Sequence, residues 1–494
     1  MSEQTLPVLI PAIYLGAGIL IPLIGLRVRS LVYPLAVLAS GAVMLISLRG
    51  LFDVMASGPM VHQMGGWAPP VGIVFVLDHL SAFVTSIVTS IGFLVMVYAR
   101  NSILDDTPQR FTVIYSLAML LLSGLTGMVL TGDMFNFYVW LEISSLSAYA
   151  LIAAGDRRGA VGAFRYLILG SLGGGFYLLG VGFLYFATGT LNMADLANLL
   201  PALHDSRVVL AGAAMIVLGL GLKMALFPLH LWLPDAYAFA PQAVSSLIAP
   251  IMTKVAAYGL IRMVLDVFGV SYMRDSIPVL AIVGWLGAVG IIVGSVWAMA
   301  QKDYRRMLAF SSVSQVGYIA VGIGLGTTLG MVGALLHILN HATMKACLFL
   351  VGGSVRLKTK ALEVAQFGGL GRQMKWTMVA FTIGAMSMIG VPPTAGFFSK
   401  WYLVRGGIQA GNWIFIVVIL ISSLLTAIYF FRMIEHVYRD ESQNENAPEP
   451  VGEAPASMFV PTVVLAFLLV ALGFGNAVIV THLLEPVASA VGGM

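Results

Sequence analysis

Cysteine and charge are the two features that this 494-residue sequence has least of. Its one cysteine, Cys347, stands within an apolar run. A single cysteine excludes an internal disulfide framework, an iron–sulfur ligand set and a CxxC metal pair. We therefore expect no redox chemistry carried by this chain itself, no bound metal and no cofactor.

Charged residues make up only 10% of the chain, whereas hydrophobic residues make up 59% and the mean hydropathy is +0.95. These values lie far outside the range of soluble globular chains. Apolar runs of about 20 residues, long enough to cross roughly 30 Å of hydrocarbon as helices, recur along almost the whole chain. The fold class predicted is an all-α polytopic membrane protein without a second, soluble domain.

A removable signal peptide and a nucleotide-binding motif are also absent. The start, "MSEQTLPVLIPAIYLG", lacks a basic region and a small-residue cleavage site, so we expect it to form the first span. The runs "GLGLK" and "GSLGGGF" lack the P-loop pattern. Nucleotide hydrolysis by this chain is therefore not expected.

About fourteen spanning helices are expected from the apolar runs. Their approximate ranges are 8–26, 31–50, 77–99, 112–131, 133–154, 162–187, 207–240, 242–268, 276–298, 304–326, 328–353, 376–410, 413–437 and 458–480. The segment from Leu51 to Val76 has Gly and Pro punctuation and a β-like end, which predicts an ordered extramembrane loop or hairpin. The polar stretch that starts at Arg439 predicts a flexible linker.

Lysine and arginine are distributed unequally between the two faces that these spans define. Most of the 26 basic residues fall on one face, and this face should be cytoplasmic. The opposite face has only Arg49, Arg207, Arg262, Arg274 and Arg405. With an even number of spans, both termini are then expected on the non-cytoplasmic side. The net charge of +4 is thus a signal of topology and gives no reason to expect nucleic-acid binding.

A small set of ionisable residues lies inside the apolar runs. Each one costs about 2.5–3.5 kcal/mol at the bilayer centre on insertion scales, so stability alone does not explain them. Because a dry setting disfavours the charged form of a lysine and a nearby carboxylate restores it, a lysine that pairs and unpairs can carry a proton. The set comprises Glu142, Lys223, Lys254, His337, His341, Lys345 and Lys400.

Prolines interrupt two of the predicted helices close to such a lysine. Pro228 follows Lys223 in "KMALFPLHLWLP", and Pro392 and Pro393 precede Lys400 in "GVPPTAGFFSK". Broken helices free backbone carbonyls and amides, which membrane proteins tolerate where protein or a water-filled cavity satisfies them. The combination of a broken helix and a buried charge is typical of ion sites in carriers.

Each of these residues also has a structural interpretation. Lys223 or Lys254 could pair with Glu142 only to fix helix packing, although transport explains their depth in apolar runs better. His337 and His341 share one helix face, which suits a proton relay or a metal. However, "HILNH" lacks the glutamate of a zinc protease motif, and haem usually takes its axial histidines from two helices. A proton relay is therefore favoured over a metal, a cofactor or packing.

The remaining ionisable residues stay open between these interpretations. Lys345, one turn beyond His341, fits a relay and a structural role equally well, and His230 in the first helix break is a further relay candidate. Asp133, Asp235 and Asp303 stand near span ends, where helix caps or loops use them at least as often as transport does.

At these positions the sequence resembles a known family. The block "KMALFPLHLWLPDAYAFAPQAVSSLIAPIMTKVAAYGLIR", with "GDMFNFYVWLEISSLSAY", "HILNHATMKACLF" and "GVPPTAGFFSKWYL", resembles the antiporter-like subunits shared by respiratory complex I, membrane-bound hydrogenases and Mrp cation/proton antiporters. The resemblance runs from about Val76 to Phe431 and is most similar to the D chain of Mrp antiporters. Lys400, where one complex I branch has glutamate, points away from that branch.

The resemblance implies two inverted five-helix repeats, each with a broken helix. It implies that Glu142 pairs with Lys223, that Lys254 stands at the centre, and that the two histidines connect the halves to Lys400. The domains expected are N-terminal helices with the extramembrane loop (1–111), a first repeat (112–268), a second repeat (269–437), a polar linker (438–457) and a C-terminal helix (458–494).

The function expected is that of a proton-translocating subunit of a Mrp-type Na⁺(cation)/H⁺ antiporter, with protons and Na⁺ as the transported ions. The chain is expected in a bacterial-type inner (cell) membrane, where it is embedded in the lipid bilayer beside other membrane subunits. The alternative is a proton-pumping subunit of a complex I-type or membrane-bound hydrogenase complex. A third interpretation, a structural scaffold whose charges only lock helices together, predicts wild-type behaviour when Lys223 and Lys254 are mutated.

Overall fold

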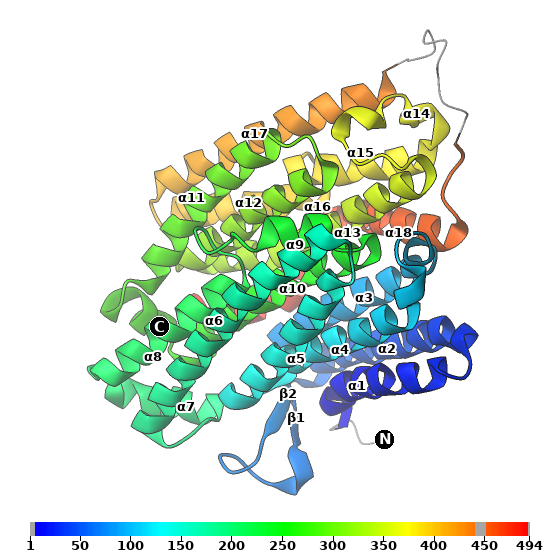
Figure 1. The fold of residues 1–494 in the computed structure, drawn as a ribbon. Helices are drawn as coiled ribbons and strands as arrows, with labels where there is room; N and C mark the ends of the chain where they lie inside the picture. Colours follow the sequence, from blue (N-terminus) through cyan, green and yellow to red (C-terminus); the bar gives the residue numbers. More distant parts are fainter. Residues whose placement is uncertain (1–4, 440–450, 493–494) are drawn as a thin grey trace.

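The computed structural model describes residues 5–439 and 451–492, and most of them are helical. Figure 1 shows long helices stacked side by side, from α1 and α2 at one edge to α11 and α17 at the other. The long helices are α1 (Leu6–Gly25), α2 (Val32–Ser57), α3 (His79–Asp106), α4 (Phe111–Leu130), α5 (Met134–Ala153), α6 (Arg157–Thr188), α8 (Arg207–Lys223), α10 (Gln242–Arg262), α11 (Val279–Met299), α12 (Tyr304–Gly324), α13 (Thr328–Thr359), α15 (Lys375–Ile389), α16 (Ala395–Gln409), α17 (Trp413–Tyr438) and α18 (Ala456–Phe474). The shorter helices are α7 (Met193–Leu199), α9 (Leu233–Phe239), α14 (Leu370–Gln373), α19 (Asn476–Ile479) and α20 (Glu485–Gly492).

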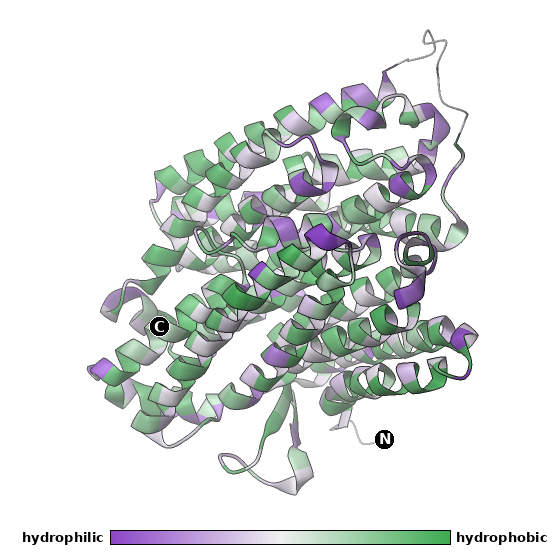
Figure 2. Ribbon diagram, viewed as in Figure 1, coloured by the Kyte–Doolittle hydropathy of each residue, from purple (hydrophilic) through white to green (hydrophobic). Residues whose placement is uncertain are grey.

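The long helices confirm an all-α membrane fold. Within the described ranges, 11 helices are long and apolar enough to cross a membrane. Apolar residues cover most of their length, while hydrophilic residues gather toward helix ends and connections (Figure 2). The other expected spans coincide with α5 and with the broken helices α8/α9 and α15/α16, so the count of fourteen stays a prediction.

Two of the helices that carry ionisable candidates, α10 and α13, lie together with α12 in the interior of the bundle. In α10, α12 and α13, 94–100% of the most apolar 18-residue window is buried against protein, compared with 28% in α1 and α2. This follows from their sequences, because buried charges and imidazoles must be kept away from lipid. The lysines and histidines of α10 and α13 therefore lie among protein groups.

The segment between α2 and α3 forms the hairpin that the sequence predicts. Strands β1 (Met60–Gln63) and β2 (Val74–Leu77) pair antiparallel, with Met60 opposite Leu77. Helix α2 continues to Ser57, seven residues beyond the predicted end, and stops where Gly58 adopts a φ of 87°. A positive φ is readily accessible to glycine, so Gly58 ends the helix without strain.

The C-terminal part differs from the predicted single helix. Helix α18 ends at Phe474 rather than at 480, and short helical turns from α19 to α20 follow it. Of the expected linker, 440–450 lie outside the described residues. The end of the linker is anchored, because the Glu453 carboxylate accepts hydrogen bonds from the backbone N–H groups of Trp376 (2.7 Å) and Thr377 (3.2 Å) at the start of α15.

Candidate functional site

The first helix break places Lys223 at the end of α8, inside the protein. Helix α8 stops at Lys223, and the chain resumes helical structure only at Leu233 in α9. Pro228 lies in this break, and Ala225 takes a positive φ of 61°. The indole N–H of Trp232 donates to the Leu222 carbonyl (3.0 Å), so part of the opened backbone is satisfied by a side chain. The break thus presents a lysine at the end of a helix rather than within one.

Lys223 has a close hydroxyl partner and a more distant carboxylate partner, both on α5. Its Nζ donates to Ser145 Oγ at 2.6 Å and lies 3.9 Å from Glu142 Oε1. The lysine is only 5% exposed, whereas Glu142 is 24% exposed, and its Oε1 has no hydrogen-bond partner among the described residues. At 3.9 Å the two charges attract one another without a direct hydrogen bond. The geometry is therefore that of a loosely closed ion pair.

Lys254 lies in the middle of α10 and is 1% exposed. Its Nζ donates to the carbonyl of Ala249 on its own helix (2.7 Å), and the structure gives it no carboxylate partner among the described residues. Pro250 stands inside α10, which nevertheless continues to Arg262. Lys254 is thus a buried amine with a single backbone acceptor among the described residues. Whether it carries a charge therefore depends on the groups around it.

The two histidines of α13 are stacked and connect this helix to α16. The His337 and His341 rings lie 5.9 Å apart, one helical turn from each other. His337 Nδ1 contacts Ser399 Oγ at 2.9 Å, while neither ring nitrogen of His341 has a hydrogen-bond partner among the described residues. An imidazole with both nitrogens free can take a proton on one side and give it up on the other.

Lys345 is held more firmly than the other lysines. Its Nζ donates to the Leu308 carbonyl and to Ser311 Oγ on α12, both at 2.5 Å. These contacts fasten α13 to α12, as the structural interpretation requires. They also leave a relay role open, because Ser311 is itself a hydroxyl that can pass a proton.

The second helix break surrounds Lys400. Its Nζ donates to the carbonyls of Met388 (3.0 Å) and Ile389 (2.9 Å), which end α15, and to Ser423 Oγ (3.1 Å) on α17. The ring of Tyr318 lies 5.0 Å away. The negative end of the α15 dipole thus faces this cation. Pro392 and Pro393 occupy the break itself, where a helical N–H is not required.

His230 lies apart from this series. It is buried in the first break and stacks against Phe227, with ring centroids 5.3 Å apart, and it lies near Trp297. None of the other candidate groups is among its described contacts. A group of three potential metal ligands is also absent from the described part of the chain.

Sequence reasoning missed the hydroxyl groups that contact the site. Ser145 accepts a hydrogen bond from Lys223, Ser423 accepts one from Lys400, and Ser399 contacts His337. In each pair the two residues lie on different helices. A small hydroxyl inside an apolar helix is a weak signal, because such serines usually bond to their own helix. Only the packing of the helices shows which of them face a titratable group.

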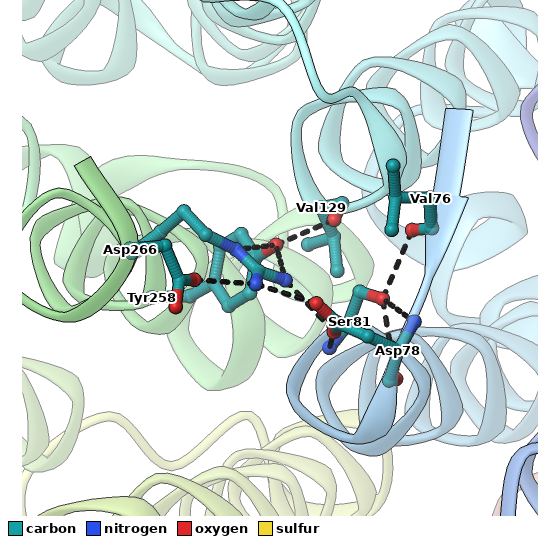
Figure 3. A network of polar contacts seen from close by, with 7 residues as sticks. Val76, Asp78, Ser81, Val129, Tyr258 and Asp266 are labelled. Carbon is teal, nitrogen blue, oxygen red and sulfur yellow. Dashed lines mark hydrogen bonds and ion pairs between the residues drawn. The ribbon is translucent and has the colours of Figure 1, made fainter. Parts of the chain in front are cut away.

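A second missed feature is a charged network at the end of α10 (Figure 3). Arg262, two turns beyond Lys254, binds Asp78 through two nitrogens (2.6 and 2.9 Å) and Asp266 (2.6 Å). The hydroxyl of Tyr258 accepts from Arg262 and donates to the Val129 carbonyl (2.6 Å). Charge counting used Arg262 only as a signal of topology, and it did not predict that this side chain is paired and only 11% exposed.

The Asp78 carboxylate anchors this network to the start of α3. Burial alone would raise the pKa of Asp78, but the Arg262 charge, its hydrogen bonds and those from Ser81 hold it at about 2. Asp78 also caps α3 by accepting the Ser81 N–H (2.8 Å). The signal in the sequence was the Asp-x-x-Ser capping pattern before the apolar run.

Comparison with known proteins gives consistent matches over nearly the whole chain. The family described as "NADH:quinone oxidoreductase/Mrp antiporter, TM" matches residues 131–426, a range that contains every candidate residue above. The N chain of the NADH-quinone oxidoreductase of Desulforudis audaxviator is 49% identical over 91% of each chain. The D chain of the Na(+)/H(+) antiporter of Alkalihalophilus pseudofirmus is 30% identical over 97% of this chain and 95% of its own.

The folds of two solved structures superpose on this chain over nearly its whole length. A chain of the Mrp complex from Dietzia sp. superposes with a TM-score of 0.88 at 26% identity, covering 100% of this chain and 98% of its own. A chain of the membrane-bound sulfane sulfur reductase, an archaeal respiratory membrane complex, gives a TM-score of 0.90 at 29% identity, with 99% and 98% covered. Both are chains of membrane complexes.

Proposed function

Because this chain belongs to the NADH:quinone oxidoreductase/Mrp antiporter transmembrane family, we propose that it translocates protons as a subunit of a Mrp-type Na⁺/H⁺ antiporter. The observation that carries the proposal is the loosely closed Glu142–Lys223 pair, 3.9 Å apart at a helix break. A pair held only to fix packing gains most from short hydrogen bonds. This pair instead leaves one carboxylate oxygen unsatisfied beside a buried ammonium.

The proposed cycle begins when Glu142 moves away from Lys223. Without its counter-charge the buried ammonium becomes acidic, and its proton passes to Lys254. From Lys254 the proton travels by His341 and His337 to Lys400, and from there to the opposite side. When the Glu142–Lys223 pair closes again, Lys223 takes up a new proton and the cycle is reset.

The arrangement within the membrane is also part of the proposal. We place the basic face in the cytoplasm of a bacterial cell and both termini on the other side of its inner membrane. The two units 112–268 and 269–437 act as inverted repeats, each contributing one broken helix and its lysine. Other hydrophobic subunits adjoin the chain and supply the cation exchange that drives or uses the proton flux.

A Lys223→Ala variant tests the proposal. The complex that carries it should assemble normally, yet sodium-driven proton exchange in sealed vesicles should be abolished. A Lys345→Met variant of the complex serves as a comparison, because its firm contacts to α12 suggest a larger effect on assembly than on exchange. Full exchange by the Lys223→Ala complex would disprove the scheme and favour the scaffold interpretation.

A second function is favoured by the relative with 49% identity, which bears the name of a redox-complex subunit. In that case the same buried groups would pump protons in a complex driven by electron transfer. Mass spectrometry of the chains that co-purify with the tagged protein separates the two possibilities. Small hydrophobic subunits alone support the antiporter, whereas iron–sulfur or flavin subunits support the redox-driven complex.

A further inference from the structure

A basic cleft lies at the end of the bundle where α1 joins α2 and α3 joins α4. Its volume is about 370 Å³, and the side chains that line it include Arg29, Arg100, Tyr33 and Phe111. The proton-transfer candidates contribute nothing to its lining. Its chemistry therefore needs an explanation separate from that of the transport groups.

Both guanidinium groups of this cleft are held in place by aromatic rings. Arg29 lies over the Phe111 ring (5.6 Å to its centroid) and donates to the Pro108 carbonyl. Arg100 lies over the Tyr33 ring at 5.3 Å. Stacking fixes the plane of a guanidinium while leaving its edge N–H groups free to donate. Each of the two arginines is thus positioned by an aromatic ring.

The positive charge of the cleft is not neutralised by the protein. Neither Arg29 nor Arg100 has a carboxylate partner among the described residues. The acidic residues at the end of α3 bind other cations, Asp105 to Lys360 (2.6 Å) and Asp106 to Arg356 (3.0 Å). Two like charges on one cleft favour an anion, and phosphate oxygens match the paired N–H groups of arginine.

The surroundings of the cleft are apolar and exposed. Leu104, which lines the cleft, is 44% exposed, and Leu26, three residues before Arg29 in the chain, is 85% exposed. From the cleft, an exposed apolar face runs along the turn before α2 and along α2 itself for about 30 Å. It is formed by the large apolar side chains at every seventh position, Leu31 (45% exposed), Leu38 (69%), Leu45 (64%) and Phe52 (66%). Free phosphate gains nothing from such a face, whereas hydrocarbon chains pack along it.

We propose that the Arg29/Arg100 cleft binds the phosphate of an anionic phospholipid whose acyl chains lie along α2. The tyrosine and the arginines stand at a helix end, the level at which aromatic and basic side chains meet headgroups. Binding requires both arginines, because Arg29, in the turn before α2, and Arg100, near the end of α3, contact the same phosphate from different segments. This site is independent of the proposed function, since it is defined by lipid retention and not by flux.

Titration of phosphatidylglycerol into the delipidated complex, followed by native mass spectrometry, tests this site. Relative to wild type, the Arg29→Gln/Arg100→Gln complex should bind the tightest phosphatidylglycerol about 10- to 30-fold more weakly, as expected for two basic residues near a headgroup. The Arg157→Gln/Lys358→Gln complex is the matched control, because it loses the same charge from exposed residues of the same basic face and should bind like wild type.

Two further measurements exclude trivial explanations. An Arg29→Lys/Arg100→Lys complex keeps the charge without the planar, bidentate donors and should bind with intermediate affinity. Inorganic phosphate should neither bind measurably nor displace the lipid. Equal lipid binding by the Gln variant and wild type, or equal loss in the control, would overturn the assignment, and so would competition by inorganic phosphate.

Discussion

Each of the two broken helices has a buried lysine beside the break, but the charge of that lysine is stabilised in different ways at the two breaks. At the first break Lys223 faces a carboxylate 3.9 Å away and a serine. At the second break Lys400 faces two carbonyls at the end of α15 and a serine, with no carboxylate partner among the described residues. A mobile side-chain charge can move away, whereas helix-end carbonyls are fixed by the backbone.

This difference suggests a division of labour between the two halves. The affinity of Lys223 for its proton changes strongly when one side chain moves, because removing a counter-charge in a poorly solvated site has a large electrostatic effect. In the proposed cycle, the affinity of Lys400 for its proton should stay nearly constant, because the helix-end dipoles beside it cannot move away. We therefore propose that the first half acts as the switch and the second as a fixed transfer point.

The strongest test of this division is Glu142→Gln. The change removes the counter-charge but keeps the side-chain shape, so Lys223 can no longer alternate between two proton affinities. We expect proton flux in vesicles to fall about 10- to 100-fold, which corresponds to one or two factors of ten in a rate. Flux near the wild-type level would show that the two breaks do not differ in the way proposed.

A carboxylate introduced at the second break should make it resemble the first. In Ser423→Asp the new side chain stands where an oxygen lies 3.1 Å from Lys400 Nζ. The added negative charge stabilises the protonated lysine, so release of the proton requires a higher pH. We expect about a tenfold loss of flux at neutral pH that is partly recovered in alkaline buffer. Ser423→Asn, similar in size and uncharged, should lack this pH-dependent recovery.

The sequence predicted the positions of these breaks, and the family resemblance implied the Glu142–Lys223 pair, but the hydroxyl and carbonyl partners of the two lysines were not predicted. The spans followed from hydropathy, because a bilayer demands about 20 apolar residues per helix. The breaks followed from Pro228 and from Pro392 with Pro393, and the site candidates from the rarity of intramembrane charge. All of these signals are local and can be read from a short window.

The missed features depend on packing between distant segments. Ser145 and Lys223 are 78 residues apart, and His337 and Ser399 are 62 apart, so no local pattern relates them. The firm attachment of Lys345 to α12 was equally hidden. Charge counting placed Arg262 on one side of the membrane but could not show that Asp78, 184 residues away, pairs with it.

The contribution of the hydrogen bond to Lys223 is smaller than that of the ion pair. Ser145→Ala removes the 2.6 Å bond and leaves Glu142 as the partner on α5. A hydrogen bond to a charged group contributes roughly 1.5–3 kcal/mol. Only part of this contribution should differ between the closed and the open Glu142–Lys223 pair, so we expect about a three- to tenfold loss of flux. Ser144→Ala is the control, since both serine hydroxyls donate to the Leu141 carbonyl but the other described contact of Ser144 is with Met128 Sδ on α4 and not with Lys223. An equal loss in both variants would point to altered packing of α5.

The smallest effect is expected from Ser423→Ala, and it tests the fixed nature of the second break. Lys400 keeps both carbonyl acceptors of α15 after this change, since the backbone of Met388 and Ile389 is not altered. The lost bond is the longest of the three, so flux should fall less than about twofold, a difference of under 1 kcal/mol. A loss as large as that of Ser145→Ala would mean that Lys400 also depends on a movable side chain. The two halves would then switch by the same kind of contact, and Glu142 would no longer set the first half apart.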